Sequence, residues 1–206
     1  MPRIHAANIE AHKAHTRRQI LDAAGLLFSR VGYAEASFGA IADLVGVGRT
    51  TIYQYFKDKD DLLASLVEDE LPRALDKLLG SLPAVGPAQR LAALLRSFIV
   101  FLAADEHLGP ILIRDAPKLS EQAQLRVGRS HASLRAELEG LYAEGVAAGE
   151  LRELAPPLVG MLLESAMRAA RRSQEAGLAA ELVADQVVEI LLNGVSSRAG
   201  SAPSGQ

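Results

Sequence analysis

The feature that most constrains the fold is a glycine-containing turn, Gly46-Val47-Gly48, between two short segments with helical periodicity. Ser37 can cap the segment before the turn. The segment after it, residues 49–56, places Ile52 and Phe56 four residues apart, on one side of a helix. Two short helices joined in this way form a helix-turn-helix, and a B-DNA major groove of about 12 Å admits the second helix.

A longer helix is predicted ahead of this motif, over residues 16–31. Thr16 and Gln19 have the spacing of a capping box at its start, and Gly32 follows as a natural stop. We expect residues 1–15 to form a flexible arm and residues 16–62 to form a three-helix DNA-binding domain. Asp58 caps a further helix, which we expect both domains to share.

The remainder of the chain is predicted to be entirely helical. Alanine and leucine supply about a third of the residues, and both favour helix. Helical periodicity covers residues 88–104, 120–148, 156–176 and 178–195, with glycine and proline between these stretches. The fold class is therefore all-α: the helix-turn-helix domain is joined to a regulatory and dimerisation domain over 63–195. Residues 196–206 are small and polar, and we expect them to be disordered.

Composition argues against most enzyme classes. The chain has no cysteine, which excludes disulfides, thiol catalysis and cysteine-held zinc or iron–sulfur sites. It has no glycine-rich phosphate loop and no His-Glu-x-x-His pattern. His5, His12 and His15 lack an accompanying set of carboxylates of ligand type. No catalytic residue, metal site or cofactor is predicted.

The start of the chain carries no apolar stretch of signal-peptide length, and no uninterrupted apolar run is long enough to span a membrane. We therefore expect a cytoplasmic protein without a membrane partner. Its charge is unevenly distributed, with a net +3 over the first 57 residues and a net −6 over the rest. A mildly basic N-terminal domain suits an anionic partner.

The second helix of the motif is free of acidic residues. Its side chains near or on the outside are Arg49, Thr50, Thr51, Tyr53, Gln54 and Tyr55. Arginine can pair with guanine, glutamine with adenine, and a threonine methyl group with thymine. Tyrosine hydroxyls can reach phosphates, and Ser37 and Lys59 stand at helix starts that suit phosphate. Packing within the domain is the alternative role for both tyrosines.

Residues 16–63 resemble the DNA-binding domain of the tetracycline-repressor-like (TetR) family of bacterial regulators. The resemblance is carried by Ile41-Ala42, Gly46-Val47 and the run from Thr51 to Leu62. It implies that Arg49, Thr50 and Gln54 read bases. It also implies phosphate contacts, which would come from Ser37, Thr51, Tyr53, Tyr55, Lys59 and the stretch 16–18. Gly48 and Thr50 depart from the family's usual serine and small residue, respectively.

The resemblance further implies a C-terminal domain that dimerises and holds a small apolar ligand. The candidate pocket walls are Phe98, Phe101, Leu102, Ile111, Tyr142, Met161 and Met167, with His107 and Arg114 as polar contacts. Ordinary core packing is the alternative for each wall residue. The last two helices are the expected homodimer interface, with a stripe formed by Leu158, Met161, Leu162, Ser165, Ala169, Val183, Val187, Ile190, Leu191 and Val195.

These features predict a regulator that binds a palindromic double-stranded DNA operator as a homodimer. We expect it to repress transcription and to be released by a small ligand. The alternatives are an activator, a ligand-independent regulator, or a helical interaction module that has lost specific DNA binding. The acid-free surface over residues 49–55 distinguishes the regulators from the last alternative, which has no reason to keep it.

Overall fold

The computed structural model describes the backbone of residues 2–195 and the side chains of residues 8–194, except those of residues 156, 157, 163, 164, 167, 171, 174 and 175. All the elements in this part of the chain are helical. The chain forms two compact units: unit 1 comprises Met1–Arg73 and Ala104–His131, and unit 2 comprises Ala74–Ala103 and Ala132–Gln206. The all-helical fold class is confirmed.

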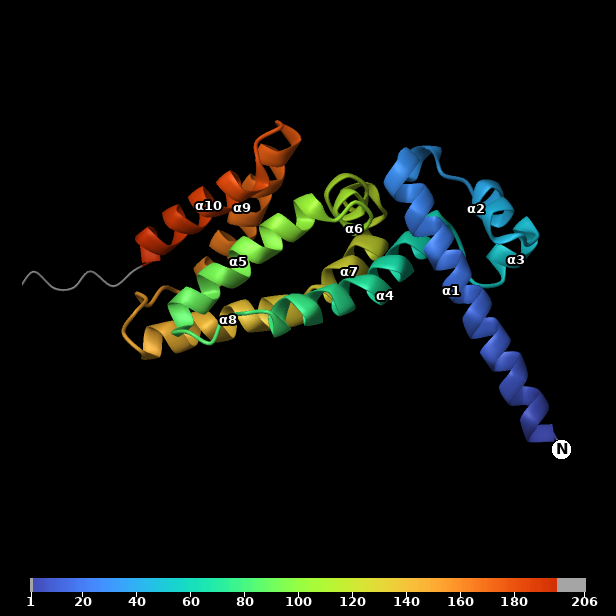
Figure 1. Ribbon diagram of the computed structural model, residues 1–206, viewed down its shortest axis with the longest axis horizontal. Coiled ribbons are helices and arrows are strands. Elements are labelled where there is room, and N and C mark those ends of the chain that lie inside the picture. The colour runs from blue at the N-terminus through green and yellow to red at the C-terminus, as the bar shows by residue number, and fades with distance from the viewer. Residues whose placement is uncertain (1, 196–206) are drawn as a thin grey trace, which may run out of the picture. The chain divides into compact units, whose positions relative to one another are not determined.

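Unit 1 contains the predicted helix-turn-helix. Its elements are α1 (Pro2–Glu35), α2 (Phe38–Val45), α3 (Arg49–Tyr53), the first part of α4 (Lys59–Gly80), α6 (Leu108–Pro110), the π-helix η1 (Ile111–Asp115), the 3₁₀ helix η2 (Ala116–Lys118) and α7 (Glu121–Ser130). Figure 1 shows α2 beside the long α1 and α3 next to α2. The first half of α4 is the most completely buried stretch of the unit, with Leu62, Leu63, Leu66 and Val67 fully inaccessible to solvent.

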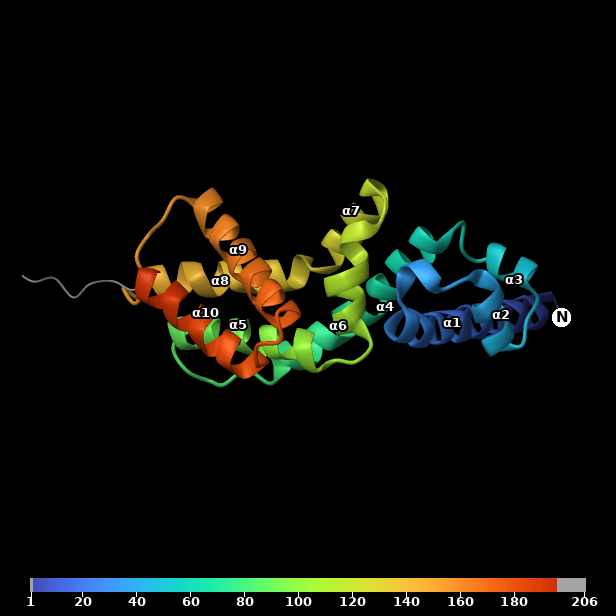
Figure 2. The ribbon, with the colours of Figure 1, turned by 90° about the horizontal axis from the view of Figure 1, so that it is seen from above.

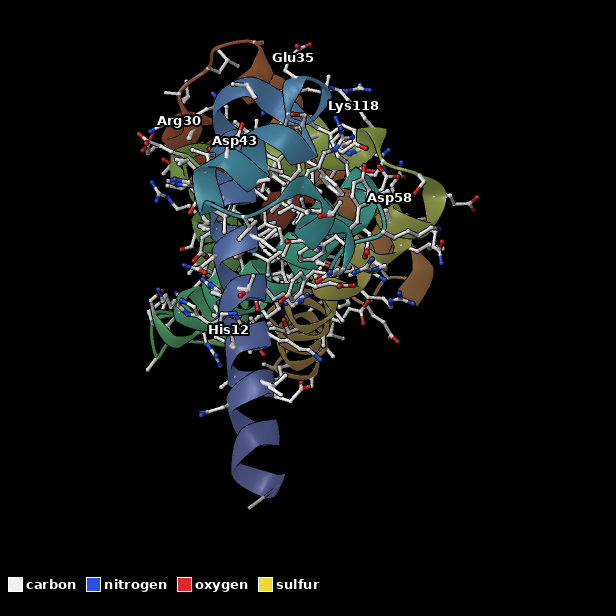
Figure 3. All side chains as sticks on the ribbon, turned by 90° about the vertical axis from the view of Figure 1, so that its right-hand side faces the viewer. His12, Arg30, Glu35, Asp43, Asp58 and Lys118 are labelled. Carbon is white, nitrogen blue, oxygen red and sulfur yellow. The ribbon has the colours of Figure 1, made fainter. Side chains whose placement is uncertain are left out.

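The predicted flexible arm is wrong, because α1 is helical from Pro2. The stretch from Arg3 to Ala24 contains neither proline nor glycine and is rich in alanine and long side chains, so nothing in it stops a helix. Thr16 is therefore not a cap. It lies in mid-helix and is buried, with a 6% exposed fraction. Figure 3 shows His12 on the stretch of α1 that projects beyond the other helices of the unit.

The predicted stop of α1 at Gly32 is confirmed in its backbone. Gly32 has φ 85° and ψ 164°, which lies outside the helical region and is essentially restricted to glycine. The chain resumes a helical turn as far as Glu35. The helix proper thus ends where the sequence predicts, and the residues after Gly32 form a separate turn before α2.

Unit 2 is built from α5 (Pro87–Ala104), α8 (Ala132–Ala147), α9 (Pro156–Glu175) and α10 (Ala180–Val195), with the last turns of α4. Helices α9 and α10 lie side by side (Figure 2). Ile99 of α5 packs in one cluster with Ala170 of α9 and with Val183 and Ala184 of α10. This cluster joins the last two helices to α5.

Helix α5 is the one helix in the described part of the chain that is long and apolar enough to cross a membrane by length and composition alone. Core packing accounts for that character. Its buried residues are Leu91, Leu94, Leu95, Phe98 and Ile99. Their spacing of three and four residues marks one helix face, as expected for a helix that packs one side against a core.

The single helix predicted over 120–148 is wrong, because it is two helices. Helix α7 ends at Ser130 and α8 begins at Ala132, with His131 between them at φ −90° and ψ 4°. The His131 ring nitrogen Nδ1 lies 2.9 Å from the carbonyl oxygen of Val127. The hydrophobic period alone did not reveal this break, which falls at the boundary between the two units.

Candidate nucleic-acid interface

Helix α2 begins and ends at the residues that the sequence indicates. Ser37 Oγ accepts a hydrogen bond from Ala40 N at 3.2 Å, which caps the first turn. Gly46 adopts a left-handed conformation (φ 77°), and its N–H donates to Ala42 O at 2.9 Å. This glycine cap turns the chain sharply towards α3.

Helix α3 has five residues, Arg49–Tyr53, and is shorter than the predicted span to Phe56. Gly48 precedes it without a side-chain cap, as its lack of a hydroxyl dictates. The chain nevertheless keeps helix-like turns after Tyr53, since the N–H groups of Tyr55 and Phe56 both donate to Ile52 O at 3.0 Å. Ile52 and Phe56 are buried as predicted and hold α3 on the core.

The outward surface of α3 presents Arg49, Thr50, Tyr53 and Gln54 to solvent, while Thr51 and Tyr55 are half-buried. Tyr53 packs edge-on against Phe38 at a ring-centroid distance of 4.9 Å, yet half of it stays exposed. Arg49 Nη2 donates to the Tyr53 hydroxyl at 3.2 Å, and its guanidinium carbon lies 5.8 Å from the centroid of that ring. The arginine is thus oriented without being neutralised, because its partner is not an acid.

The start of α4 is capped from both directions. Asp58 Oδ1 accepts from Asp61 N at 2.8 Å, and Asp61 Oδ2 accepts from Lys57 N at 2.8 Å. This reciprocal pair satisfies one N–H group in the first turn, that of Asp61, and one just before the helix, that of Lys57. It also fixes the backbone immediately after α3, because Lys57 directly follows the buried Phe56.

Lys59 does not stand free to meet a phosphate. Its ammonium group donates to the carbonyl oxygens of Tyr33 (2.6 Å), Ala34 (3.1 Å) and Ala36 (2.9 Å). It thereby closes the C-terminal end of α1, where unpaired carbonyls and the negative end of the helix dipole attract a cation. The predicted phosphate contact of Lys59 is replaced by this structural role.

The stretch 16–18 is likewise occupied within the unit. Arg17 lies over the Phe56 ring, 5.4 Å from its centroid. Arg18 pairs with Asp22 at 2.8 Å and with Asp69 at 2.6 Å. With Thr16 buried, the expected outer phosphate contact of this stretch has no support in the geometry.

Helix α7 is fastened to α4 through Arg126. Its Nε and Nη2 donate to the two carboxylate oxygens of Glu68 at 2.9 and 2.6 Å. Its Nη1 donates to Asp61 Oδ1 at 2.6 Å, and Nη2 also reaches Ser65 Oγ at 2.9 Å. No local pattern in the sequence points to Arg126, since its partners lie about sixty positions away.

The carboxylates around Arg126 are held in their ionised forms. The hydrogen bond from Arg126, which outweighs the effect of burial, keeps the pKa of Glu68 below its ordinary value. Burial opposes ionisation of Asp61, but hydrogen bonds from Lys57 N and Arg126 overcome it and lower its pKa. The same contacts, that with Glu68 foremost, raise the pKa of Arg126 far above its ordinary value. The cluster is a fully charged, hydrogen-bonded network.

A second fastening lies at Asp60. Its carboxylate accepts hydrogen bonds from the Tyr33 hydroxyl and, at 2.8 Å, from Ser120 N, the residue before α7. Burial and the neighbouring Asp60 raise the pKa of Tyr33 well above its ordinary value. The phenol therefore remains a donor, and α1, α4 and α7 meet on this one carboxylate.

Three of the predicted ligand-site residues, Arg114, His107 and Ile111, lie in unit 1. The Arg114 guanidinium donates to Phe28 O at 2.6 Å and pairs with the buried Asp115 at 2.9 Å. A Cβ at Gly32 would meet it at 3.4 Å, so it lies directly on the end of α1. His107 is exposed at the start of α6. Ile111 is fully buried in the core.

The predicted pocket walls in unit 2 differ in their burial and in their contacts. Phe98 is buried and stacks on Phe101 at 6.2 Å between ring centroids, and Leu102 follows half-buried. The Tyr142 hydroxyl donates to Arg152 O at 2.7 Å and accepts from Leu154 N at 2.8 Å, so it ties the loop after α8. Met161 is 63% exposed on α9, and its role as a wall stays a prediction. Met167 lies outside the described side chains.

The last two helices present an outer apolar surface. On α9, Leu158, Met161 and Leu162 are exposed, and on α10 Ile190 is 75% exposed. Val183, predicted to lie in the interface, is buried against Ala184 and Ile99 within the unit. The predicted stripe therefore splits into a buried face and an exposed face.

Comparison with known proteins identifies the family. Residues 20–66 match the description "Bacterial regulatory proteins, tetR family", and residues 84–195 match "Tetracyclin repressor-like, C-terminal domain". The chain is 25% identical over 187 residues to the fatty acid metabolism regulator protein of Bacillus subtilis, covering 87% of this chain and 95% of that one. It is also 49% identical over 53 residues to the regulator AcrR of Shigella flexneri, covering 26% and 25% of the two chains.

Solved structures share the fold. The transcriptional regulator FadR of Bacillus subtilis, in complex with stearoyl-CoA, superimposes with a TM-score of 0.73 at 22% identity over 86% of this chain and 98% of that one. A TetR/AcrR-family regulator of Thermobifida fusca gives a TM-score of 0.66 at 31% identity over 86% and 97%. The relatives are regulators rather than enzymes. With both family descriptions matched in order along it, the chain belongs to the TetR family of DNA-binding transcriptional regulators.

Proposed function

We propose that this regulator represses transcription by binding a palindromic operator as a cytoplasmic homodimer. Arg49, Thr50 and Gln54 read base edges in the major groove. Ser37, Thr51, Tyr53 and Tyr55 hold the flanking phosphates. Lys59 is left out of this set, because its ammonium group is committed to three backbone carbonyls.

The observation that carries the proposal is the outward surface of α3. It presents an arginine, threonines, a glutamine and tyrosines, and no acidic residue. The turn at Gly46 before α3 and the capped start of α4 after it hold this short helix in place. A helix that only needed solubility would carry glutamate or aspartate among these positions, whereas a phosphate surface repels them.

The dimer is supported by the outer surface of α9 and α10. Apolar side chains of this size and exposure mark a protein-binding surface when they gather on neighbouring helices. Two helices from each subunit would form a four-helix bundle, and a twofold axis would set two copies of α3 on successive major grooves.

A small apolar ligand is the proposed release signal. The Bacillus subtilis FadR structure holds stearoyl-CoA, so a long-chain acyl thioester is the first candidate for this chain. The proposed walls of its pocket are the Phe98–Phe101 pair, which stacks on α5, and Leu102. Release requires that the ligand bind a conformation with the wrong spacing of recognition helices more tightly than the operator-bound one.

Selection of genomic fragments by the purified protein at fixed salt tests the proposal. A recovered palindrome establishes a sequence-specific dimer, and the double variant Arg49→Ala/Gln54→Ala should lose that enrichment. Stearoyl-CoA, free coenzyme A and stearate are then added separately to the protein–operator complex. Release by the thioester alone supports the ligand class, while salt-sensitive, sequence-blind binding would refute operator reading.

A further inference from the structure

We propose that Arg126 is a positioning residue for operator reading: from α7 it fixes the backbone that follows the recognition helix α3. The inference rests on the function proposed above and adds a residue outside the helix-turn-helix. Its basis is an uninterrupted path of hydrogen bonds from Arg126, through Asp61, to Lys57 N.

The first step is the grip of α7 on α4. Asp61, Ser65 and Glu68 stand at intervals of four and three residues, which places them on one face of α4. Arg126 engages all three, with two parallel hydrogen bonds to Glu68. A guanidinium bound in this bidentate way fixes direction as well as distance, which a single ion pair does not.

The second step is the link to α3. One carboxylate oxygen of Asp61 accepts from Arg126 and the other accepts from Lys57 N. A single side chain therefore joins α7 to the backbone that follows α3. Lys57 follows Phe56, whose buried ring anchors the end of the recognition segment. Removing Arg126 therefore frees one side of the carboxylate that holds this backbone.

The third step concerns how accurately the two recognition helices must be positioned on an operator. A homodimer must present two recognition helices at the spacing of two half-sites, and base contacts carry no tolerance for a helix that tilts. Phosphate contacts position the protein on the duplex but carry no sequence information, so discrimination between operators depends on the base contacts. Loss of Arg126 should therefore reduce discrimination between operator geometries, beyond any loss of folded protein.

Arg129 supplies a matched control. It lies on α7 three residues after Arg126 and is exposed. Arg129→Ala removes the same charge from the same helix and leaves the network of Asp61, Ser65 and Glu68 in place. A third variant, Arg126→Lys, keeps the charge and discards the forked geometry.

The test compares binding of the full-length variants to the selected operator and to a version with one base pair inserted between its half-sites. The active fraction of each preparation is first fixed by stoichiometric titration, so that unfolded protein does not enter the comparison. For Arg126→Ala we expect about a tenfold weaker affinity for the native operator, with a much smaller loss on the inserted one. Arg126→Lys should resemble Arg126→Ala, and Arg129→Ala should resemble the unaltered protein.

A second readout does not depend on DNA. Amide hydrogen exchange at Lys57 should accelerate in Arg126→Ala and not in Arg129→Ala, because the Asp61 cap loosens only in the former. Equal losses on both operators with unchanged exchange at Lys57 would overturn the inference and leave Arg126 as a stabilising residue. If the unaltered protein selects no palindrome, the proposed function itself fails, and the inference fails with it.

Discussion

Lys59 Nζ lies 2.6 Å from the carbonyl oxygen of Tyr33 and 4.5 Å from the centroid of the same residue's ring. Lys59, the first residue of α4, therefore contacts both the backbone and the side chain of Tyr33 at the end of α1. A lysine placed where the sequence suggests a phosphate contact is instead an internal fastening of the DNA-binding unit.

Lys59→Ala should lower the free energy of unfolding by about 2 kcal/mol, because it strips a charged donor from carbonyls that lie at a helix end. Thermal or urea unfolding measures this loss. The slope of log affinity against log salt should stay unchanged once the active fraction is corrected. A slope shallower by about 0.9 would restore Lys59 to the phosphate contacts.

Arg49→Ala and Gln54→Ala should each cost about 1–3 kcal/mol at the operator and relax the preferred base at one position. Competition titrations against operators with single-base changes measure both effects. Arg30→Ala serves as the control, since Arg30 is an exposed charge on α1, outside the helix-turn-helix. Equal losses on operator and random DNA would contradict base reading.

Glu70→Gln should stabilise the protein near pH 7. Burial raises the pKa of Glu70, Arg18 partly opposes this, and Asp22, Asp69 and Asp105 add to it. The folded state therefore binds the proton more tightly than the unfolded state, so stability falls as pH rises through the ordinary value of Glu70 to its raised one. Melting temperatures of variant and parent should converge in acid, and a difference that stays constant with pH would contradict this.

Acid should weaken the Arg126 network, so its pH dependence is opposite to the one expected for Glu70. The pKa values of Asp61 and Glu68 are depressed by the contacts described above. Their contribution to stability is complete above their ordinary pKa values and is lost as pH falls through the depressed ones. Urea unfolding from pH 6 to pH 2 should show a shallower acid loss in Arg126→Ala than in the parent, and parallel curves would contradict this.

Ile190→Asp should convert the dimer to a monomer. Ile190 is 75% exposed on α10, so a charge there costs little in an isolated chain and much when two copies pack their apolar surfaces. Light scattering after size exclusion measures the mass. Leu125→Asp is the control, because Leu125 is 62% exposed on α7 and lies outside the proposed interface.

Local chemistry made the helix-turn-helix predictable. Ser37, Gly46 and Asp58 each act within a few residues of their own position, so their side-chain type and spacing indicated where helices begin and end. The four-residue interval between Ile52 and Phe56 was enough to indicate which side of α3 is buried. Residues whose partners lie within one helical turn are the ones that a sequence describes well.

Distant partners explain what the sequence did not reveal. The sequence predicts Lys59 as a phosphate contact, Arg114 as a polar ligand contact and Tyr142 as a pocket wall. Their hydrogen bonds go to backbone carbonyls of Tyr33, Phe28 and Arg152, and a carbonyl leaves no mark in a sequence. The predicted cap at Thr16 is wrong for a different reason, because its capping-box spacing lies within a helix that begins at Pro2.

The division of the chain into units has a consequence for chimeric regulators. Unit 1 is discontinuous, and its second segment carries Arg114, Ser120 and Arg126 to the helices of the first. A graft that exchanges only residues up to 62 between two relatives would leave these three partners behind in the recipient. Hybrids that carry both segments of unit 1 from the donor should keep the donor's operator preference. Hybrids that carry only residues up to 62 should keep the donor's base-reading side chains but hold α3 in a misaligned position.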